Sequence, residues 1–212
     1  MNAIQYHLNR LKACKPALKW ARSQDNPLEA WITCPRGDWL LWLALKLGVE
    51  HRAVVRAACA CARLALPFSE DERPLRAILM TERWAAGDKD VTLDQVKEAA
   101  AECREAALDA GCYADYAASN TAFAAMYAGY AATTNRTPKE SAAAAAESAA
   151  HAAADGATCH AEAEAALAAV HQACANAVRS KIDTDTIMKL WWRHATGSGR
   201  KTIRVISEEG QP

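Results

Sequence analysis

The stretch 141–154, SAAAAAESAAHAAA, decides the fold class, and the stretch 161–178, AEAEAALAAVHQACANAV, repeats its character. Alanine is the strongest helix former because it loses no side-chain entropy in a helix. It also buries little apolar area, so alanine-rich helices gain stability mainly where their backbones approach closely. Alanine dominates from residue 99 to residue 177. This region therefore predicts a tightly packed antiparallel helical bundle with short loops.

Helix caps and stops divide the rest of the chain into further helices. Gly48 and Gly87 each follow a segment with helical periodicity, as expected of glycine just past a helix end. The segments 69–72 and 92–95 have the spacing of a capping box, and Asp38 is placed to cap a helix over 39–47. The sequence thus predicts an all-α protein, an antiparallel bundle of nine or ten helices.

The predicted helices fall into three segments. Residues 1–68 are expected to form an N-terminal helical subdomain, and 69–182 the alanine-rich bundle. Residues 183–212 are expected to form a terminal helix and a polar tail with a strand-like run, Thr202–Ile206. The run 39–47, WLLWLALKL, is apolar almost all round and should be the centre of the N-terminal half. Trp39 and Trp42 are accordingly expected to be packing anchors.

The cysteines indicate a reducing compartment. The chain has 8 cysteines, but its first residues lack the apolar segment of a signal peptide, and no stretch is long enough to span a membrane. We therefore expect a cytoplasmic protein whose thiols are free. Five cysteines among alanine and leucine are expected in the core: Cys14, Cys59, Cys61, Cys103 and Cys174.

Charge is unevenly distributed although the net charge is zero. Residues 1–66 hold 10 Lys and Arg against 4 Asp and Glu, whereas residues 67–180 hold 9 against 17. A basic end is suited to nucleic acid and an acidic body to a basic protein, although solvated helix faces also produce such an asymmetry.

Two candidate contact surfaces follow from this polarity. Five carboxylates recur at three- or four-residue spacing and predict an acidic stripe on one helix face, the first candidate for binding a protein partner: Asp94, Glu98, Glu102, Glu105 and Asp109. The alternative is direct nucleic-acid binding through basic N-terminal residues: Arg10, Lys12, Lys15, Lys19 and Arg22.

No catalytic or cofactor motif stands out. His171 and Cys174 lie three residues apart, with His151, Cys159 and His160 upstream, so a zinc site between two helices was considered, but the spacing is unlike that of zinc-binding motifs. The segment 197–201, GSGRK, lacks the spacing of a phosphate-binding loop. We expect neither an enzyme nor a bound metal or cofactor.

Two groups of short sequence motifs resemble motifs of other proteins. The stretch 61–78, CARLALPFSEDERPLRAI, followed by WAAG at 84–87, is similar to alanine-rich helical immunity proteins of bacterial toxin systems. The sequence motif that these immunity proteins share is matched here by Asp71, Arg73, Pro74, Ala77 and Ile78.

N-terminal phrases extend the resemblance. The run 34–43, CPRGDWLLWL, and shorter phrases before it are similar to uncharacterised phage and prophage proteins. Together the two resemblances cover roughly residues 8–180. They imply conflict between bacteria, or between bacteria and phage, and hence an inhibitor that occludes a toxin or defence effector. A phage-encoded antagonist of a defence complex such as a CRISPR effector is the alternative target assignment.

Overall fold

The computed structural model describes residues 2–133 and 138–196, and within them the protein is all-helical with eleven α-helices. Their bounds are α1 Ala3–Arg10, α2 Lys15–Trp20, α3 Pro27–Thr33, α4 Gly37–Leu47, α5 His51–Arg63, α6 Glu72–Ala86, α7 Leu93–Cys112, α8 Tyr116–Thr133, α9 Pro138–Asp155, α10 His160–Lys181 and α11 Thr184–Thr196. The predicted all-α class is confirmed, with slightly more helices than the nine or ten expected. The predicted strand-like run Thr202–Ile206 lies outside the described residues.

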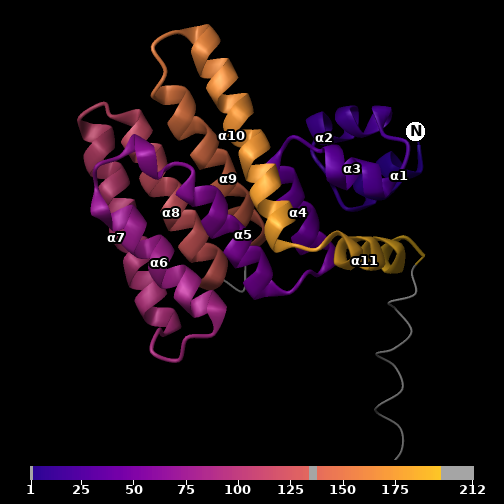
Figure 1. The fold of residues 1–212 in the computed structure, drawn as a ribbon, viewed down its shortest axis with the longest axis horizontal. Helices are drawn as coiled ribbons and strands as arrows, with labels where there is room; N and C mark the ends of the chain where they lie inside the picture. Colours follow the sequence, from indigo (N-terminus) through magenta and orange to yellow (C-terminus); the bar gives the residue numbers. More distant parts are fainter. Residues whose placement is uncertain (1, 134–137, 197–212) are drawn as a thin grey trace, which may run out of the picture.

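The helices form an antiparallel bundle with a smaller layer beside it (Figure 1). We call α7–α10 the alanine bundle; α8 lies inside it, against α5, α6, α7 and α9. We call α1–α4 with α11 the tryptophan layer. Helix α4 joins the two, because it packs against α9 and α10 on one side and against α11 on the other. One hydrophobic core runs through both regions, from Ile4 to Trp191. The boundaries expected at residues 68 and 182 stay predictions.

Small residues set the close approach of helices in the alanine bundle. A methyl group added at Gly129 of α8 would lie 2.8 Å from the Cβ atom of Ala100 on α7. At the junction with the tryptophan layer, one added at Gly37 of α4 would lie 2.4 Å from the Cβ atom of Cys174 on α10. Both distances are shorter than side chains tolerate, so neither position has room for a side chain unless its neighbour shifts.

Several predicted helix ends are confirmed. Gly48 and Gly87 adopt the left-handed conformation past α4 and α6, with φ of 83° and 89°. Thr92 and Gln95 form the complete capping box of α7. Two predicted caps are wrong. Asp71 rather than Ser69 caps α6, and α4 begins at Gly37, so that Asp38 lies inside its first turn. Asp38 instead pairs with Arg36.

The predicted core needs two corrections. Cys14 is exposed, whereas Cys59, Cys61, Cys103 and Cys174 are buried as expected. Trp39 and Trp42 are only partly buried, whereas Trp31 and Trp191 are buried, with 1% and 4% of their surfaces exposed. Trp39 and Trp42 pack against the core with part of their surface and also line a cavity.

Candidate binding site

An apolar cavity of about 290 Å³ lies within the tryptophan layer. Helices α1, α2, α3, α4 and α11 supply its walls, and Ala143 of α9 completes them. Five tryptophans line it: Trp20, Trp31, Trp39, Trp42 and Trp191. Its size and its aromatic, mostly apolar walls are typical of a ligand or anchor site.

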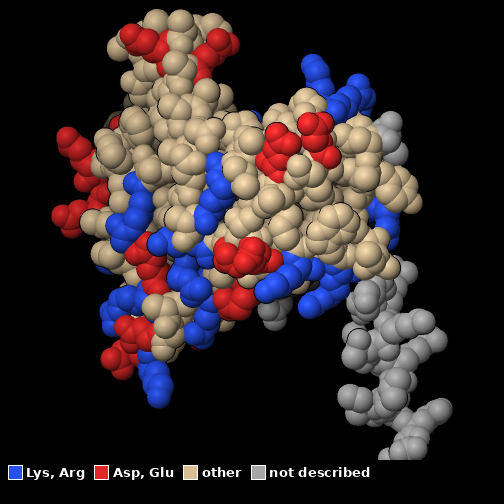
Figure 2. All heavy atoms as spheres, turned by 45° about the vertical axis from the view of Figure 1, so that its right-hand side comes forward, with Lys and Arg blue, Asp and Glu red and all other residues tan. Residues whose placement is uncertain are grey.

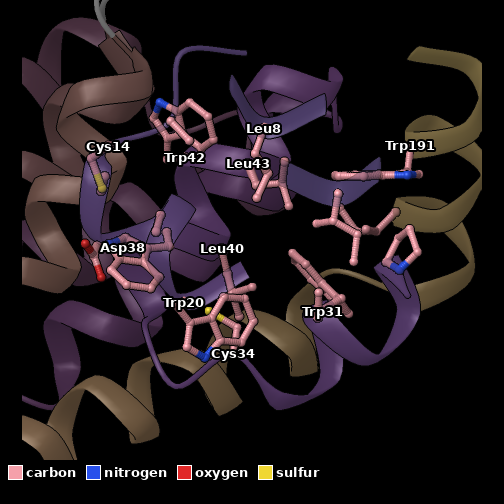
Figure 3. Close-up of a pocket in the computed structure, with 18 of the residues that line it drawn as sticks. Leu8, Cys14, Trp20, Trp31, Cys34, Asp38, Leu40, Trp42, Leu43 and Trp191 are labelled. Carbon is pink, nitrogen blue, oxygen red and sulfur yellow. The ribbon is translucent and has the colours of Figure 1, made fainter. Parts of the chain in front are cut away.

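Helical spacing places these rings. Trp39, Trp42 and Leu43 lie three and four residues apart on α4 and therefore share one face. Trp20 at the end of α2 reaches the same wall, with its ring centroid 6.2 Å from that of Trp39. Trp31 and Trp191 lie at one end of the pocket, and Cys14 and Asp38 at the other (Figure 3).

The polar groups of the cavity are few. The Arg36 guanidinium donates to both oxygens of Asp38, at 2.7 and 2.8 Å, and lies over the Trp39 ring at 5.2 Å from its centroid. Asp38 therefore already has a cationic partner within the chain, and Glu147 shares this partner, with its Oε2 atom 3.2 Å from Nη2 of Arg36. The buried indole N–H of Trp31 has no hydrogen-bond partner. At the opening, Lys12 and Cys14 are both exposed.

A buried histidine lies behind this wall. Nδ1 of His171 on α10 is 3.8 Å from the Asp38 carboxylate and has no hydrogen-bond partner. Burial lowers the pKa of His171 to about 4, and the nearby Arg36 charge acts in the same direction. The ring is therefore neutral at pH 7 and forms no ion pair with Asp38 there.

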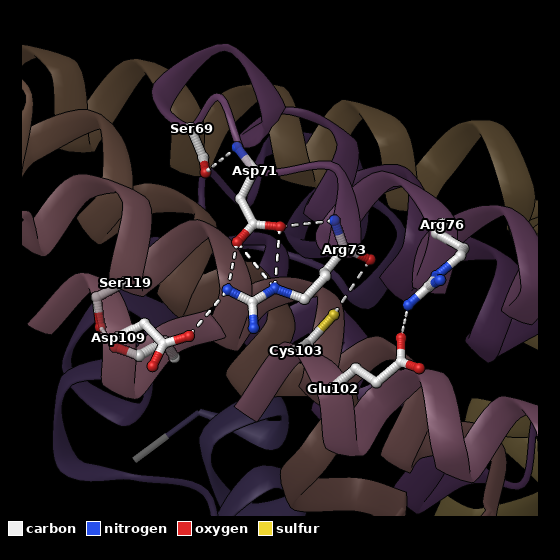
Figure 4. A network of polar contacts seen from close by, with 9 residues as sticks. Ser69, Asp71, Arg73, Arg76, Glu102, Cys103, Asp109 and Ser119 are labelled. Atoms are coloured by element: carbon white, nitrogen blue, oxygen red, sulfur yellow. Dashed lines mark hydrogen bonds and ion pairs between the residues drawn. The ribbon is translucent and has the colours of Figure 1, made fainter. Parts of the chain in front are cut away.

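The acidic stripe on α7 exists as a surface but is largely engaged within the chain. Asp94 accepts from Lys97 at 2.7 Å, Glu102 pairs with Arg76, and Asp109 accepts from Arg73 at 3.0 Å (Figure 4). The remaining two members, Glu98 and Glu105, are exposed and have no ion pair within the described residues. Only part of the predicted stripe is free to meet a partner's charges.

The phrase that carries the immunity-protein resemblance has a structural role here. Asp71 caps α6 and binds the Arg73 guanidinium, which also reaches Asp109 on α7 (Figure 4). Ala77 and Ile78 are buried in the core. The phrase therefore fixes the start of α6 and ties it to α7.

The basic N-terminal residues behave differently from the acidic stripe. Arg10, Lys12, Lys15, Lys19 and Arg22 are all exposed, and in the described part of the chain none of them forms an ion pair. Figure 2 shows basic side chains projecting from the surface over the N-terminal helices, with acidic side chains near them, and further acidic side chains at the end where α9 meets α10. Of these five cations, Lys12 is the one that also lines the cavity.

The residues considered for zinc do not come together. His171 and Cys174 are buried, whereas His151, Cys159 and His160 are exposed, the last two at the start of α10. Among residues 2–133 and 138–196, no group of three or more His, Cys, Asp and Glu side chains has an arrangement that could hold a metal ion.

Sequence reasoning found the tryptophans but missed the cavity. Trp39 and Trp42 were interpreted as packing anchors because apolar runs are usually core. Their three-residue spacing does show that they share a face, but the rings opposite them come from α2, α3 and α11. That juxtaposition depends on tertiary structure, and no local sequence pattern indicates it.

Comparisons with known proteins add no family assignment: no protein-family model, curated protein or solved structure matches the chain. Within the described residues, no helix combines the length and the apolar character needed to cross a bilayer.

Proposed function

We propose that this chain is a non-catalytic binding protein that neutralises a partner protein, such as a bacterial toxin or a defence effector, by stoichiometric occlusion. The tryptophan cavity is the centre of its contact surface. The observation that carries this proposal is the grouping of five tryptophans around one open apolar cavity. Tryptophan is enriched among the residues that dominate binding energy in interfaces, especially in desolvated pockets.

This proposal places the contact with the partner at the tryptophan cavity and not at the acidic stripe of α7. Three of the five stripe carboxylates are engaged by cations of the same chain, and a partner would have to compete with those pairs. The cavity instead offers unfilled apolar surface. The resemblance to immunity proteins supports the inhibitory role, and a phage-encoded antagonist of a host defence complex is the alternative with the same contact surface.

A cavity-filling variant tests the proposal. Ala30 lines the cavity and is partly buried, so Ala30→Phe places a ring in the space that a partner's side chain would occupy. Ala168→Phe on the exposed face of α10 adds the same ring away from the cavity. The measurement is co-purification from native host cells, with mass spectrometry of the bound protein and a thermal melt of each variant.

We expect the wild type and Ala168→Phe to retain a stoichiometric partner protein and a folded Ala30→Phe to lose it. Equal retention by Ala30→Phe would show that the contact lies elsewhere. Recovery of the chain without any protein partner would reject the inhibitor proposal.

Direct nucleic-acid binding is the second candidate, favoured by the five exposed and unpaired cations of residues 10–22. Binding of this kind depends on phosphate contacts and weakens steeply with salt. The test is fluorescence anisotropy with labelled single- and double-stranded DNA at increasing salt, for the wild type and for Lys15→Glu combined with Lys19→Glu. Absence of salt-dependent binding by the wild type removes this candidate.

A further inference from the structure

Arg36 connects the cavity wall to the alanine bundle, although it is not itself a lining residue. Its guanidinium donates to both carboxylate oxygens of Asp38, at 2.7 and 2.8 Å, and to the Glu147 carboxylate of α9 at 3.2 Å. The same guanidinium lies over the ring of Trp39, 5.2 Å from its centroid, within the range of cation–π attraction. One side chain therefore contacts a lining carboxylate, a lining tryptophan and a neighbouring helix.

The backbone of Arg36 is held as well. Arg36 lies immediately before α4, and its carbonyl accepts from the Leu40 N–H at 3.2 Å and from the Cys34 thiol at 3.6 Å. Carboxylates thus fix the charged end of the side chain, and the first turn of α4 fixes the main chain. A planar guanidinium held at both ends restricts the orientation of the ring that it covers.

The contact reaches a second lining tryptophan. The ring centroids of Trp20 and Trp39 are 6.2 Å apart, and their planes are tilted by 57°. Among the described residues, no other ring contact joins two tryptophans. Trp20 ends α2 and Trp39 lies in α4. A fixed Trp39 ring therefore also restricts the ring that α2 contributes to the cavity.

We infer that Arg36 is a positioning residue of the cavity, whose guanidinium holds the rings of Trp39 and Trp20 in one arrangement before a partner binds. This inference rests on the proposed function and adds how its contact surface is prepared. A preformed wall favours binding, because its side chains lose little further conformational freedom when a partner's side chain enters.

Lys46 supplies a matched comparison on the same helix. Its ammonium lies 5.6 Å from the ring centroid of Trp42, another lining tryptophan. In the part of the chain that the structure describes, Lys46 forms no ion pair, so no carboxylate fixes this cation. Lys46→Gln therefore removes a cation from a lining ring without breaking an ion-pair network.

The arrangement of the two rings can be measured directly. Two indole rings held close together at a fixed tilt couple their electronic transitions and give an exciton couplet in far-ultraviolet circular dichroism. Trp20→Phe and Trp39→Phe, each in the full chain, identify the part of the spectrum that comes from this pair. Arg36→Lys retains a positive charge beside both carboxylates, so we expect it to fold. It lacks the planar fork that binds Asp38 at two points and covers the ring.

We expect a folded Arg36→Lys to lose most of the couplet and Lys46→Gln to retain it. The double variant Arg36→Gln and Asp38→Asn removes the guanidinium without leaving the buried carboxylate unpaired. It should lose the couplet in the same way. Thermal melts establish that each variant is folded.

An uncharged probe relates the ring arrangement to binding. N-phenyl-1-naphthylamine fluoresces more strongly in apolar surroundings, so its titration reports on the cavity. We expect the wild type to bind the probe and a folded Ala30→Phe not to bind it. Arg36→Lys should raise the dissociation constant by about 3- to 10-fold, because the probe must then immobilise rings that Arg36 held. Lys46→Gln should leave the dissociation constant nearly unchanged.

Any of four results would overturn the inference: a wild type that does not bind the probe, a couplet that persists in either Arg36 variant, equal loss of the couplet in Lys46→Gln, or probe binding by Arg36→Lys as tight as that of the wild type. If Ala30→Phe loses the co-purifying partner while Arg36→Lys keeps the couplet, the proposed function stands and the positioning inference falls. If the Arg36 variants lose the couplet while Ala30→Phe retains the partner, Arg36 positions the rings but the proposed contact surface is wrong.

Discussion

The alanine bundle and the tryptophan layer fill their interiors in opposite ways. In the bundle, alanine and glycine let helix backbones approach so closely that a single methyl at Gly129 would collide with Ala100. In the tryptophan layer, large rigid rings surround a cavity of about 290 Å³. Small side chains allow such close contact, whereas the large rings of the layer, such as those of Trp20 and Trp39 with centroids 6.2 Å apart, line a cavity. We infer that the bundle supplies stability and that the layer supplies recognition.

The two regions also differ in how far their surface charges are engaged in ion pairs. Carboxylates of the bundle, such as Glu102 and Asp109, are bound by arginines of α6. Cations of the tryptophan layer, such as Lys15 and Lys19, have no such partners within the described residues. In the bundle, ion pairs thus engage part of the surface charge and leave Glu98 and Glu105 unpaired within the described residues.

The largest expected effect separates the two kinds of tryptophan in the layer. Trp31→Ala removes a ring that is 1% exposed, and we expect a loss of about 3–5 kcal/mol in the free energy of unfolding. Trp42→Ala removes a partly exposed ring and should cost at most about 2 kcal/mol. Urea unfolding of both variants measures the difference. If both variants lose the same free energy of unfolding, the cavity is closed in solution. The alanine bundle and the tryptophan layer would then no longer differ in how they fill their interiors.

The next effect lies at the junction of the two regions. The folded-state pKa of His171, about 4, is below its unfolded value of 6.5, so the unfolded chain takes up the proton first as the pH falls. The stability is fully present above pH 6.5, and on the order of 3 kcal/mol is lost as the pH falls to about 4. Denaturant unfolding at a series of pH values should show this loss in the wild type and a shallower one in His171→Gln.

Neighbouring groups must be controlled in that experiment. Arg36, Asp38 and His151 interact electrostatically with both His171 and Glu147. Burial raises the pKa of Glu147, which makes its own contribution to stability grow as the pH falls, opposite to that of His171. Comparison of Glu147→Gln with the double variant Glu147→Gln and His171→Gln isolates the contribution of the histidine. If these two variants have the same pH profile of stability, His171 is not buried as described.

A smaller effect tests the close contacts of the bundle. Gly129→Ala places a methyl 2.8 Å from Ala100 on a neighbouring helix, and we expect a net destabilisation of about 1–3 kcal/mol from overpacking. Gly111→Ala in α7 is the matched control, because its nearest neighbour, the Ser119 hydroxyl, is 3.8 Å away. There the better helix propensity of alanine should stabilise by up to about 1 kcal/mol. Thermal melts of the two variants should move in opposite directions, and a Gly129→Ala variant that melts at or above the wild-type temperature would show that the bundle is loosely packed.

The smallest effect concerns the acidic stripe. Glu98→Lys combined with Glu105→Lys should change the free energy of unfolding by less than about 0.5 kcal/mol and leave partner binding unchanged. Glu102→Lys combined with Asp109→Lys breaks the ion pairs with Arg76 and Arg73 and should cost up to about 1 kcal/mol for each pair. Chemical denaturation and partner titration measure the two effects. Loss of partner binding in Glu98→Lys combined with Glu105→Lys would show that the contact surface lies on α7.

The candidate site was harder to predict than the helices that build it. The stripe was correctly placed on the exposed face of α7, because helical spacing alone determines which residues share a face. That Asp109 is engaged depends on Arg73, 36 residues earlier in the chain. The exposure of Cys14 had no sequence signal either, since a cysteine between alanine and lysine occurs in cores and at surfaces alike.

The sequence by itself determined the helical class and several helix ends. Alanine propensity acts residue by residue, and the capping box of Thr92 and Gln95 and the left-handed stops at Gly48 and Gly87 involve neighbours within a few residues. Only the tertiary structure decided that rings from α2, α3, α4 and α11 enclose a cavity and that Lys12 lies at its rim. Local conformational preferences depend on short windows of sequence. A cavity, in contrast, is the space left over when segments separated by more than a hundred residues meet, and its shape depends on all of them together.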